Sequence, residues 1–149
     1  MKRIFLDTNV LLDLIDADRP GHSTALEIEH LMEQSNLQGL LAWHSLSIIE
    51  YVGGKKFGAP HIHRLLNALL EVFSIPATST ADAKKAFQYL SSDLEDALQI
   101  SCALAGNTDV IVSNDKNGFE QSPIPVMTPE ELIARPRTIP RSPDAPGSP

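Results

Sequence analysis

Four acidic residues lie far apart in this chain, yet each stands where a folded α/β sheet would collect it: Asp7, Glu50, Asp96 and Asp115. Asp7 directly follows the apolar residues 4–6, and Asp115 comes three positions after the apolar residues 110–112. A short apolar run that ends in polar residues is typical of a buried parallel strand. Because open α/β sheets bind ligands at the carboxyl ends of their strands, both acids are predicted to line one crevice.

A bound cation would offset the repulsion among these four carboxylates. Asp7 and Asp115 would enter the crevice from strands, and Glu50 and Asp96 from helices that face it. Without a cation between them, such charges would repel each other. Hard oxygen ligands suit Mg²⁺ or Mn²⁺, and these ions support the hydrolysis of phosphodiesters. The pattern therefore predicts a divalent-metal site with hydrolytic chemistry.

Each acid also has an ordinary structural interpretation. Asp7 and Thr8 could cap the following helix, and Asp115 could be a turn residue. Glu50 lies in residues 46–52 (LSIIEYV), and a lone acid on a helix is usually solvated. Its flanking residues are mostly apolar, however, which predicts partial burial of Glu50. Burial of an ionised carboxylate without a cation would be costly or would force protonation.

Three acids crowd the start of one helix, and their positions separate their predicted roles. Acids there complement the helix dipole whether or not they bind metal. Asp96 shares a helical face with Ile100 and Ala103, so it is predicted to look toward the sheet. Glu95 is assigned to a capping box with Ser92. Asp93, one turn before Asp96, is predicted as an outer or alternative metal ligand.

Strand and helix patterns alternate along most of the chain. Strands are predicted at residues 3–6, 40–43, 72–75, 110–113 and 125–127, and helices at 8–14, 22–34, 45–51, 60–71, 81–90, from a cap at 92 to 104, and after 128. This alternation predicts a three-layer α/β/α sandwich with a central parallel sheet of four to five strands. Residues 1–134 form the predicted domain. The Pro/Arg/Ser-rich residues 135–149 are predicted to be disordered, because they offer little apolar surface to bury.

Composition narrows the classes of function. The chain has 149 residues and a net charge of −7, which argues against strong non-specific binding of nucleic acid. It suggests either that affinity for RNA or DNA is modest and local or that a basic partner contributes. The single Cys102 cannot form an internal disulfide, which fits a reducing cytoplasm. No signal peptide or membrane-spanning stretch is expected, because the first strand begins near Lys2 and no apolar run is long enough.

Three segments resemble the PIN-domain family. Residues 6–13 (LDTNVLLD) resemble the opening of PIN-domain proteins, and residues 93–99 (DLEDALQ) resemble their third acidic motif. Residues 111–115 (IVSND), Phe119 and residues 122–131 resemble the closing segment of a bacterial subgroup. That subgroup often has an acid immediately before the final Phe, where this chain has Gly118. The resemblance covers about residues 2–134.

The resemblance implies a function as well as a fold. It implies a Mg²⁺- or Mn²⁺-dependent endoribonuclease that leaves a 5′-phosphate and a 3′-hydroxyl. Many short bacterial members are VapC-type toxins, often homodimeric and held silent by a protein antitoxin. By motif, Asp7, Glu50, Asp96 and Asp115 would be the first to fourth acids and metal ligands, with Thr8 or Ser113 positioning them.

Three other functions compete with the ribonuclease interpretation, and each predicts a different pattern of residues. A PIN-like module that binds RNA or protein without hydrolysing RNA would be expected to lack a core acid, and none of the four is missing. A haloacid-dehalogenase-type phosphatase needs Asp-x-Asp after its first strand, whereas this chain has Asp7-Thr8-Asn9. A receiver domain needs a phosphoacceptor Asp after a central strand, and no such residue is evident.

Overall fold

The fold is built around a strand that is apolar on both faces. In the computed structural model, which describes residues 1–136, β1 (Arg3–Leu6) is the middle strand of a sheet with the order β3-β2-β1-β4-β5. Ile4 and Leu6 pack into one core cluster and Phe5 into another. Burial of each of these side chains contributes roughly 1.5–3 kcal/mol, so β1 ties both sides of the domain together.

The sheet is entirely parallel, as predicted. β1 pairs with β2 (Gln38–Leu40) on one side and with β4 (Val110–Val112) on the other. β3 (Phe73–Ser74) and β5 (Val126–Met127) form the edges. In the register of the central pair, Leu6 lies beside Val112, so the residues that follow these two strands emerge side by side.

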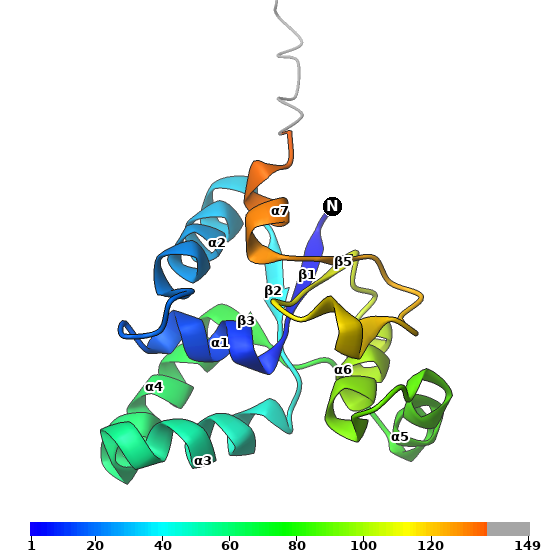
Figure 1. Ribbon diagram of the computed structural model, residues 1–149, viewed down its shortest axis with the longest axis horizontal. Helices are drawn as coiled ribbons and strands as arrows, with labels where there is room; N and C mark the ends of the chain where they lie inside the picture. Colours follow the sequence, from blue (N-terminus) through cyan, green and yellow to red (C-terminus); the bar gives the residue numbers. More distant parts are fainter. Residues whose placement is uncertain (137–149) are drawn as a thin grey trace, which may run out of the picture.

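Helices cover the sheet on both faces (Figure 1). One layer holds five helices, whose apolar side chains share a core cluster with Ile4 and Leu6: α1 (Thr8–Ile15), α2 (His22–Ser35), α3 (Ser45–Phe57), α4 (Ala59–Val72) and α7 (Pro129–Ala134). The opposite layer holds α5 (Thr80–Ala86), the 3₁₀ turn η1 (Phe87–Tyr89), α6 (Leu94–Ala105) and the 3₁₀ turn η2 (Lys116–Phe119). The predicted three-layer α/β/α sandwich is confirmed.

The element boundaries depart from the sequence prediction in several places. β2 ends at Leu40 rather than at Trp43, and β3 is shorter than predicted. The helix predicted at 81–90 ends at Ala86 and continues as η1. α3 does not end at Gly53 but runs on to Phe57, and Gly53 lies against α4. A Cβ on Gly53 would lie 2.6 Å from Ile62 Cδ1.

Two predictions concern the C-terminal part of the chain. The predicted cap of the last helix is confirmed, since Thr128 and Glu131 form a capping box at the start of α7. The tail predicted to be disordered lies, from residue 137 onward, outside the described residues. Within residues 1–136, no helix is both long and apolar enough to cross a membrane.

Candidate active site

Asp7 occupies the point where β1 gives way to α1. It holds the N-cap position of α1, but its side chain makes no capping hydrogen bond. Instead, Gln99 Nε2 donates to Asp7 Oδ1 at 2.8 Å, and Ser113 Oγ donates to Asp7 Oδ2 at 2.8 Å. Asp7 is 4% exposed. The carboxylate is therefore held by residues of α6 and the end of β4, which suits a site residue better than a helix cap.

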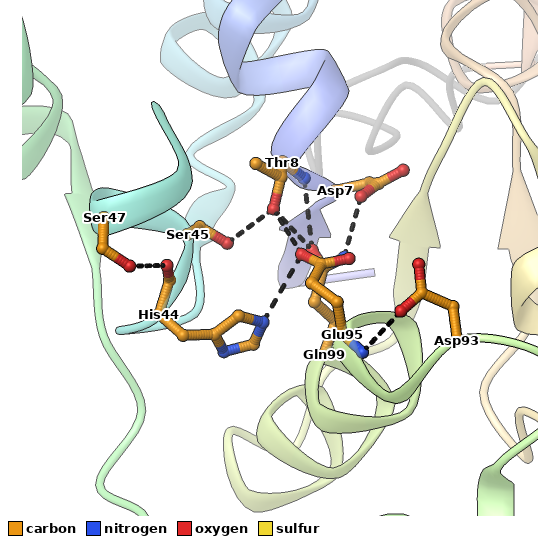
Figure 2. A network of polar contacts seen from close by, with 8 residues as sticks. All are labelled: Asp7, Thr8, His44, Ser45, Ser47, Asp93, Glu95 and Gln99. Atoms are coloured by element: carbon orange, nitrogen blue, oxygen red, sulfur yellow. Dashed lines mark hydrogen bonds and ion pairs between the residues drawn. The ribbon is translucent and has the colours of Figure 1, made fainter. Parts of the chain in front are cut away.

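Two further carboxylates enter this site from the first turn of α6. Asp93 is the N-cap residue, and its side chain accepts a hydrogen bond from the backbone N–H of Glu95. Glu95 Oε1 accepts a 2.9 Å hydrogen bond from Thr8 Oγ1 (Figure 2). One carboxylate oxygen each of Asp7, Glu95 and Asp96 lies within 4.8 Å of the others, which is close enough for all three to hold one cation.

Gln99 joins two of the three acids. It is fully buried, one helical turn after Glu95. Its Nε2 donates to Asp7 Oδ1 and also to Glu95 Oε2 at 3.0 Å, while its Oε1 accepts the backbone N–H of Thr8 at 3.2 Å. Because each polar atom of the amide has a partner, Gln99 fixes the two carboxylates relative to each other.

The Thr8 hydroxyl extends this network to α3 (Figure 2). It donates to Glu95 Oε1, so the 2.8 Å contact with the buried Ser45 Oγ must have Ser45 as donor. His44 Nε2 lies 3.4 Å from Glu95 Oε1, which makes an ion pair when the imidazole is protonated. Residues preceding and opening α3 thus support Glu95 from the side opposite Asp7.

The shared site perturbs the titration of the acids. Burial, a hydrogen bond with Glu95 and the charges of neighbouring acids raise the pKa of Asp96 to about 7. Burial also raises the pKa of Asp7, although hydrogen bonds from Gln99 and Ser113 oppose the shift. Burial acts to raise the pKa of Glu95 too, but His44, Thr8 and Asp96 outweigh it and the pKa is lowered. Without a cation, Asp96 is thus the acid that holds a proton beside an ionised Glu95.

This raised pKa predicts how the metal-free protein responds to pH. A folded-state pKa above the ordinary value of 3.8 means that the folded protein binds the Asp96 proton more tightly. The resulting stability is fully present below about pH 4 and is lost as the pH rises through about 7. In thermal melts with a chelator, Asp96→Asn should weaken this decline in Tm relative to wild type. An unchanged slope in the variant would contradict the assignment.

Gly118 lies against the carboxylate of Asp96. A Cβ at this buried position in η2 would lie 2.9 Å from Asp96 Cγ and closer still to Oδ2. Any larger side chain at position 118 would therefore occupy the space of Asp96. Asp96 can hold its position only because residue 118 has no side chain.

Gly118→Ala should therefore displace Asp96 and reduce the phosphodiester hydrolysis predicted for this site. The clash is with the end of a flexible side chain, so we expect a small change in Tm but a loss of about 100-fold in kcat/KM, as for other displacements of about 1 Å at an active site. Gly54→Ala is the matched control, because its Cβ would meet nothing nearer than 3.8 Å. Wild-type cleavage by Gly118→Ala would show that Asp96 tolerates the displacement.

The structure places Asp115 beside the cluster but not within it. Its exposed carboxylate accepts the backbone N–H of Asn117 at 3.0 Å, and its own N–H donates to Ser113 Oγ at 3.1 Å. Asp115 therefore abuts Ser113, the residue that binds Asp7, while its side chain caps η2.

Glu50 is also outside the group of three carboxylates. It lies on α3 with its side chain 52% exposed, and His63 Nε2 of α4 is 3.1 Å from its Oε1. The predicted burial of Glu50 is wrong, because the residues three and four positions further along the helix are Gly53 and Gly54, which cover nothing. Its place among the metal ligands is a prediction that this arrangement does not support.

A second buried acid, Asp13, secures the loop after β4. Its Oδ1 accepts a 2.7 Å hydrogen bond from Arg19 Nε, and its Oδ2 accepts one of 3.0 Å from Asn114 Nδ2. Asn114 lies between Ser113 and Asp115, so this pairing of α1 with the loop helps to set the position of both. The charge of Asp13 is thus matched locally, away from the three clustered acids.

Sequence reasoning missed Glu95 and Gln99 as site residues. The capping box assigned to Ser92 and Glu95 is wrong, since α6 begins one residue later with Asp93 as its cap. The signal that would have found them is their i, i+4 spacing, which places both on one helical face. A Gln in an otherwise apolar helical stretch was the second clue, because a buried amide needs specific partners.

The protein is thus a parallel α/β/α domain with three acids gathered at the carboxyl end of its central strand, where they could hold a cation. The family model for the PIN domain matches residues 3–117, so the chain belongs to the PIN-domain family. Ribonuclease VapC1 of Aquifex aeolicus (strain VF5) is 27% identical, over 93% of this chain and 98% of the relative.

Solved structures show the same fold at lower identity. DNA-bound VapBC from Salmonella typhimurium matches with a TM-score of 0.67 and 17% identity, covering 87% of this chain and 99% of that one. VapC20 of Mycobacterium tuberculosis, a Sarcin-Ricin loop cleaving toxin, matches with a TM-score of 0.63 and 15% identity, covering 77% and 92%.

Proposed function

We propose that this protein is a divalent-metal-dependent endoribonuclease and the toxin of a toxin–antitoxin pair. The observation that carries the proposal is the convergence of the Asp7, Glu95 and Asp96 carboxylates within 4.8 Å at the carboxyl end of β1. The similarity to a ribonuclease over nearly the full length of both chains supports the same conclusion.

The three acids offer hard oxygen ligands, which fit Mg²⁺ or Mn²⁺ better than a softer metal. Such an ion activates a bound water for attack and neutralises charge that develops on the phosphate. Asp7 would be the most fixed ligand, since Gln99 and Ser113 hold its two oxygens. Asp96 would lose its proton on metal binding, because a cation favours the ionised form against the burial and the neighbouring acids that raise its pKa.

The remaining acids receive lesser roles in this proposal. Asp115 and Glu50 would act from outside the group of three, on water or substrate, rather than as its central ligands. Asp93 would act as the cap that orients the first turn of α6, through its bond to the Glu95 N–H. Thr8 and Ser113 would position the ligands, Thr8 through Glu95 and Ser113 through Asp7.

An antitoxin and a second copy of the chain are the proposed protein partners. Solved relatives with this fold include VapBC from Salmonella typhimurium, which supports a protein partner for this chain. The net charge of −7 favours a partner segment that is basic. A homodimer is proposed from the resemblance to VapC-type toxins.

The test is RNA cleavage by the purified protein without a partner. Single-stranded RNA should be cut internally with Mg²⁺ or Mn²⁺ and left intact with a chelator, and the products should carry 5′-phosphates. Cleavage that persists in excess chelator would exclude the metal mechanism. Intact RNA with every divalent ion would favour the non-hydrolytic binding module instead.

A further inference from the structure

Trp43 is exposed at the rim of the candidate active site. It is the only tryptophan of the chain, it lies between β2 and α3, and it is 72% exposed. A single exposed apolar side chain is common on protein surfaces. The surroundings of Trp43 therefore decide whether its exposure has a use.

Those surroundings form a pocket. Trp43 and His44 line one part of it, Ser79 and Asp82 at the start of α5 line another, and Leu98 and Cys102 of α6 line a third. The pocket thus lies between the loop after β2 and the two helices of the α5–α6 layer. It offers one large aromatic face together with apolar and polar side chains.

His44 links the pocket to the site of the three acids. His44, which lines the pocket, is 3.4 Å from Glu95 at Nε2 and Oε1. Leu98 and Cys102 follow Glu95 at positions i+3 and i+7, so the three share one face of α6. An RNA strand whose phosphate reaches a cation held by Glu95 and Asp96 would therefore carry its neighbouring groups past this pocket.

The charge of the lining selects which part of a nucleotide fits. Among residues 1–136, no Lys or Arg lines the pocket, and Asp82 does, which disfavours a phosphate. The carboxylate of Asp82 accepts the backbone N–H of Ser79 at 2.9 Å and so belongs to a fixed capping box. A neutral planar group that can stack on an indole and reach polar atoms at its edge suits this lining better.

We propose that this pocket is a nucleobase subsite, in which one unpaired base of the RNA substrate stacks on Trp43 beside the metal centre. The proposal rests on the proposed ribonuclease function and adds to it a preference for an unstacked nucleotide next to the cleaved bond. Stacking on an aromatic side chain accepts any base, so the subsite would favour single-stranded RNA rather than one sequence.

Kinetics provide the first test. Trp43→Ala should reduce kcat/KM for single-stranded RNA by about 5- to 150-fold, mainly through KM, as expected for the loss of one stacked base. Trp43→Phe should restore most of the loss. Tyr51→Ala removes another aromatic side chain, 69% exposed on α3, and should cleave like wild type.

Fluorescence provides the second test, because the one tryptophan reports on its own contacts. In the Asp7→Asn variant, a short single-stranded RNA should quench Trp43 emission, and an abasic oligomer of equal length should not. Equal quenching by both would assign the pocket to the backbone and overturn the proposal.

The two hypotheses fail in different ways. If wild type cleaves RNA and Trp43→Ala matches its kcat/KM, the subsite is overturned and the nuclease function stands. Suppose instead that wild type cleaves no RNA with any divalent ion, but that RNA quenches Trp43 emission and the abasic oligomer does not. The nuclease function then fails, and a base-binding pocket remains.

Discussion

Asp7→Asn should reduce metal-dependent RNA cleavage by more than about 100-fold, beyond the 10- to 100-fold typical of residues that only support a metal ligand. Asn keeps the shape of the side chain but removes the charge at the centre of the cluster. The loss should be measured as kcat/KM with Mn²⁺ on single-stranded RNA, and Asp18→Asn, at an exposed surface ion pair with Lys56, should cleave like wild type.

The same substitution should spare the metal-free fold. Asp7 is buried beside two other acids, so a neutral side chain relieves repulsion and a desolvation cost. We expect the Tm in chelator to stay equal or rise, and the stabilisation of wild type by Mn²⁺ to be lost, because an ion that binds only the folded state raises its stability. Unimpaired cleavage by Asp7→Asn would reduce Asp7 to a structural residue.

The sheet was predictable because its signals are local. Apolar runs such as residues 4–6 and 110–112 are buried on both faces, and such runs mark central parallel strands wherever they occur. The position of Asp7 next to Ser113 depends in addition on the pairing of β1 with β4, in which Leu6 and Val112 are in register. Strand ends were less predictable: Leu41 is buried and its N–H binds Ser74 O, yet β2 ends before it.

The helical acids were harder to place because one residue of helix register changes which side chain faces inward. Ser92 and Asp93 are both good N-caps, and the sequence does not decide between them. With Asp93 as the cap, Glu95 and Asp96 both lie in the first turn and both reach Asp7. For Glu50 the sequence neighbours were misleading, since burial on a helix depends on positions three and four away.

Glu95 provides the sharpest test of the arrangement seen in the structure. As a metal ligand, Glu95→Gln should lose more than about 100-fold in kcat/KM, similar to Asp96→Asn and beyond the range for supporting residues. Gln can still accept the hydrogen bond from Thr8, and Gln99 loses its bond to residue 95 but keeps the one to Asp7, so the fold should be retained. The measurement is cleavage of single-stranded RNA with Mn²⁺, together with the Mn²⁺ concentration for half-maximal rate, which should rise.

Two further substitutions provide comparisons for the loss of activity expected at Glu95 and Asp96. Asp93→Asn keeps a good N-cap and should lose less activity than Asp96→Asn, because Asp93 lies outside the group of three. Glu50→Gln should likewise lose less than Glu95→Gln, since Glu50 is exposed and bonded to His63. If Glu50→Gln were the more damaging of the two, α3 would have to present Glu50 to the metal in the working enzyme, and Glu95 would return to a supporting role.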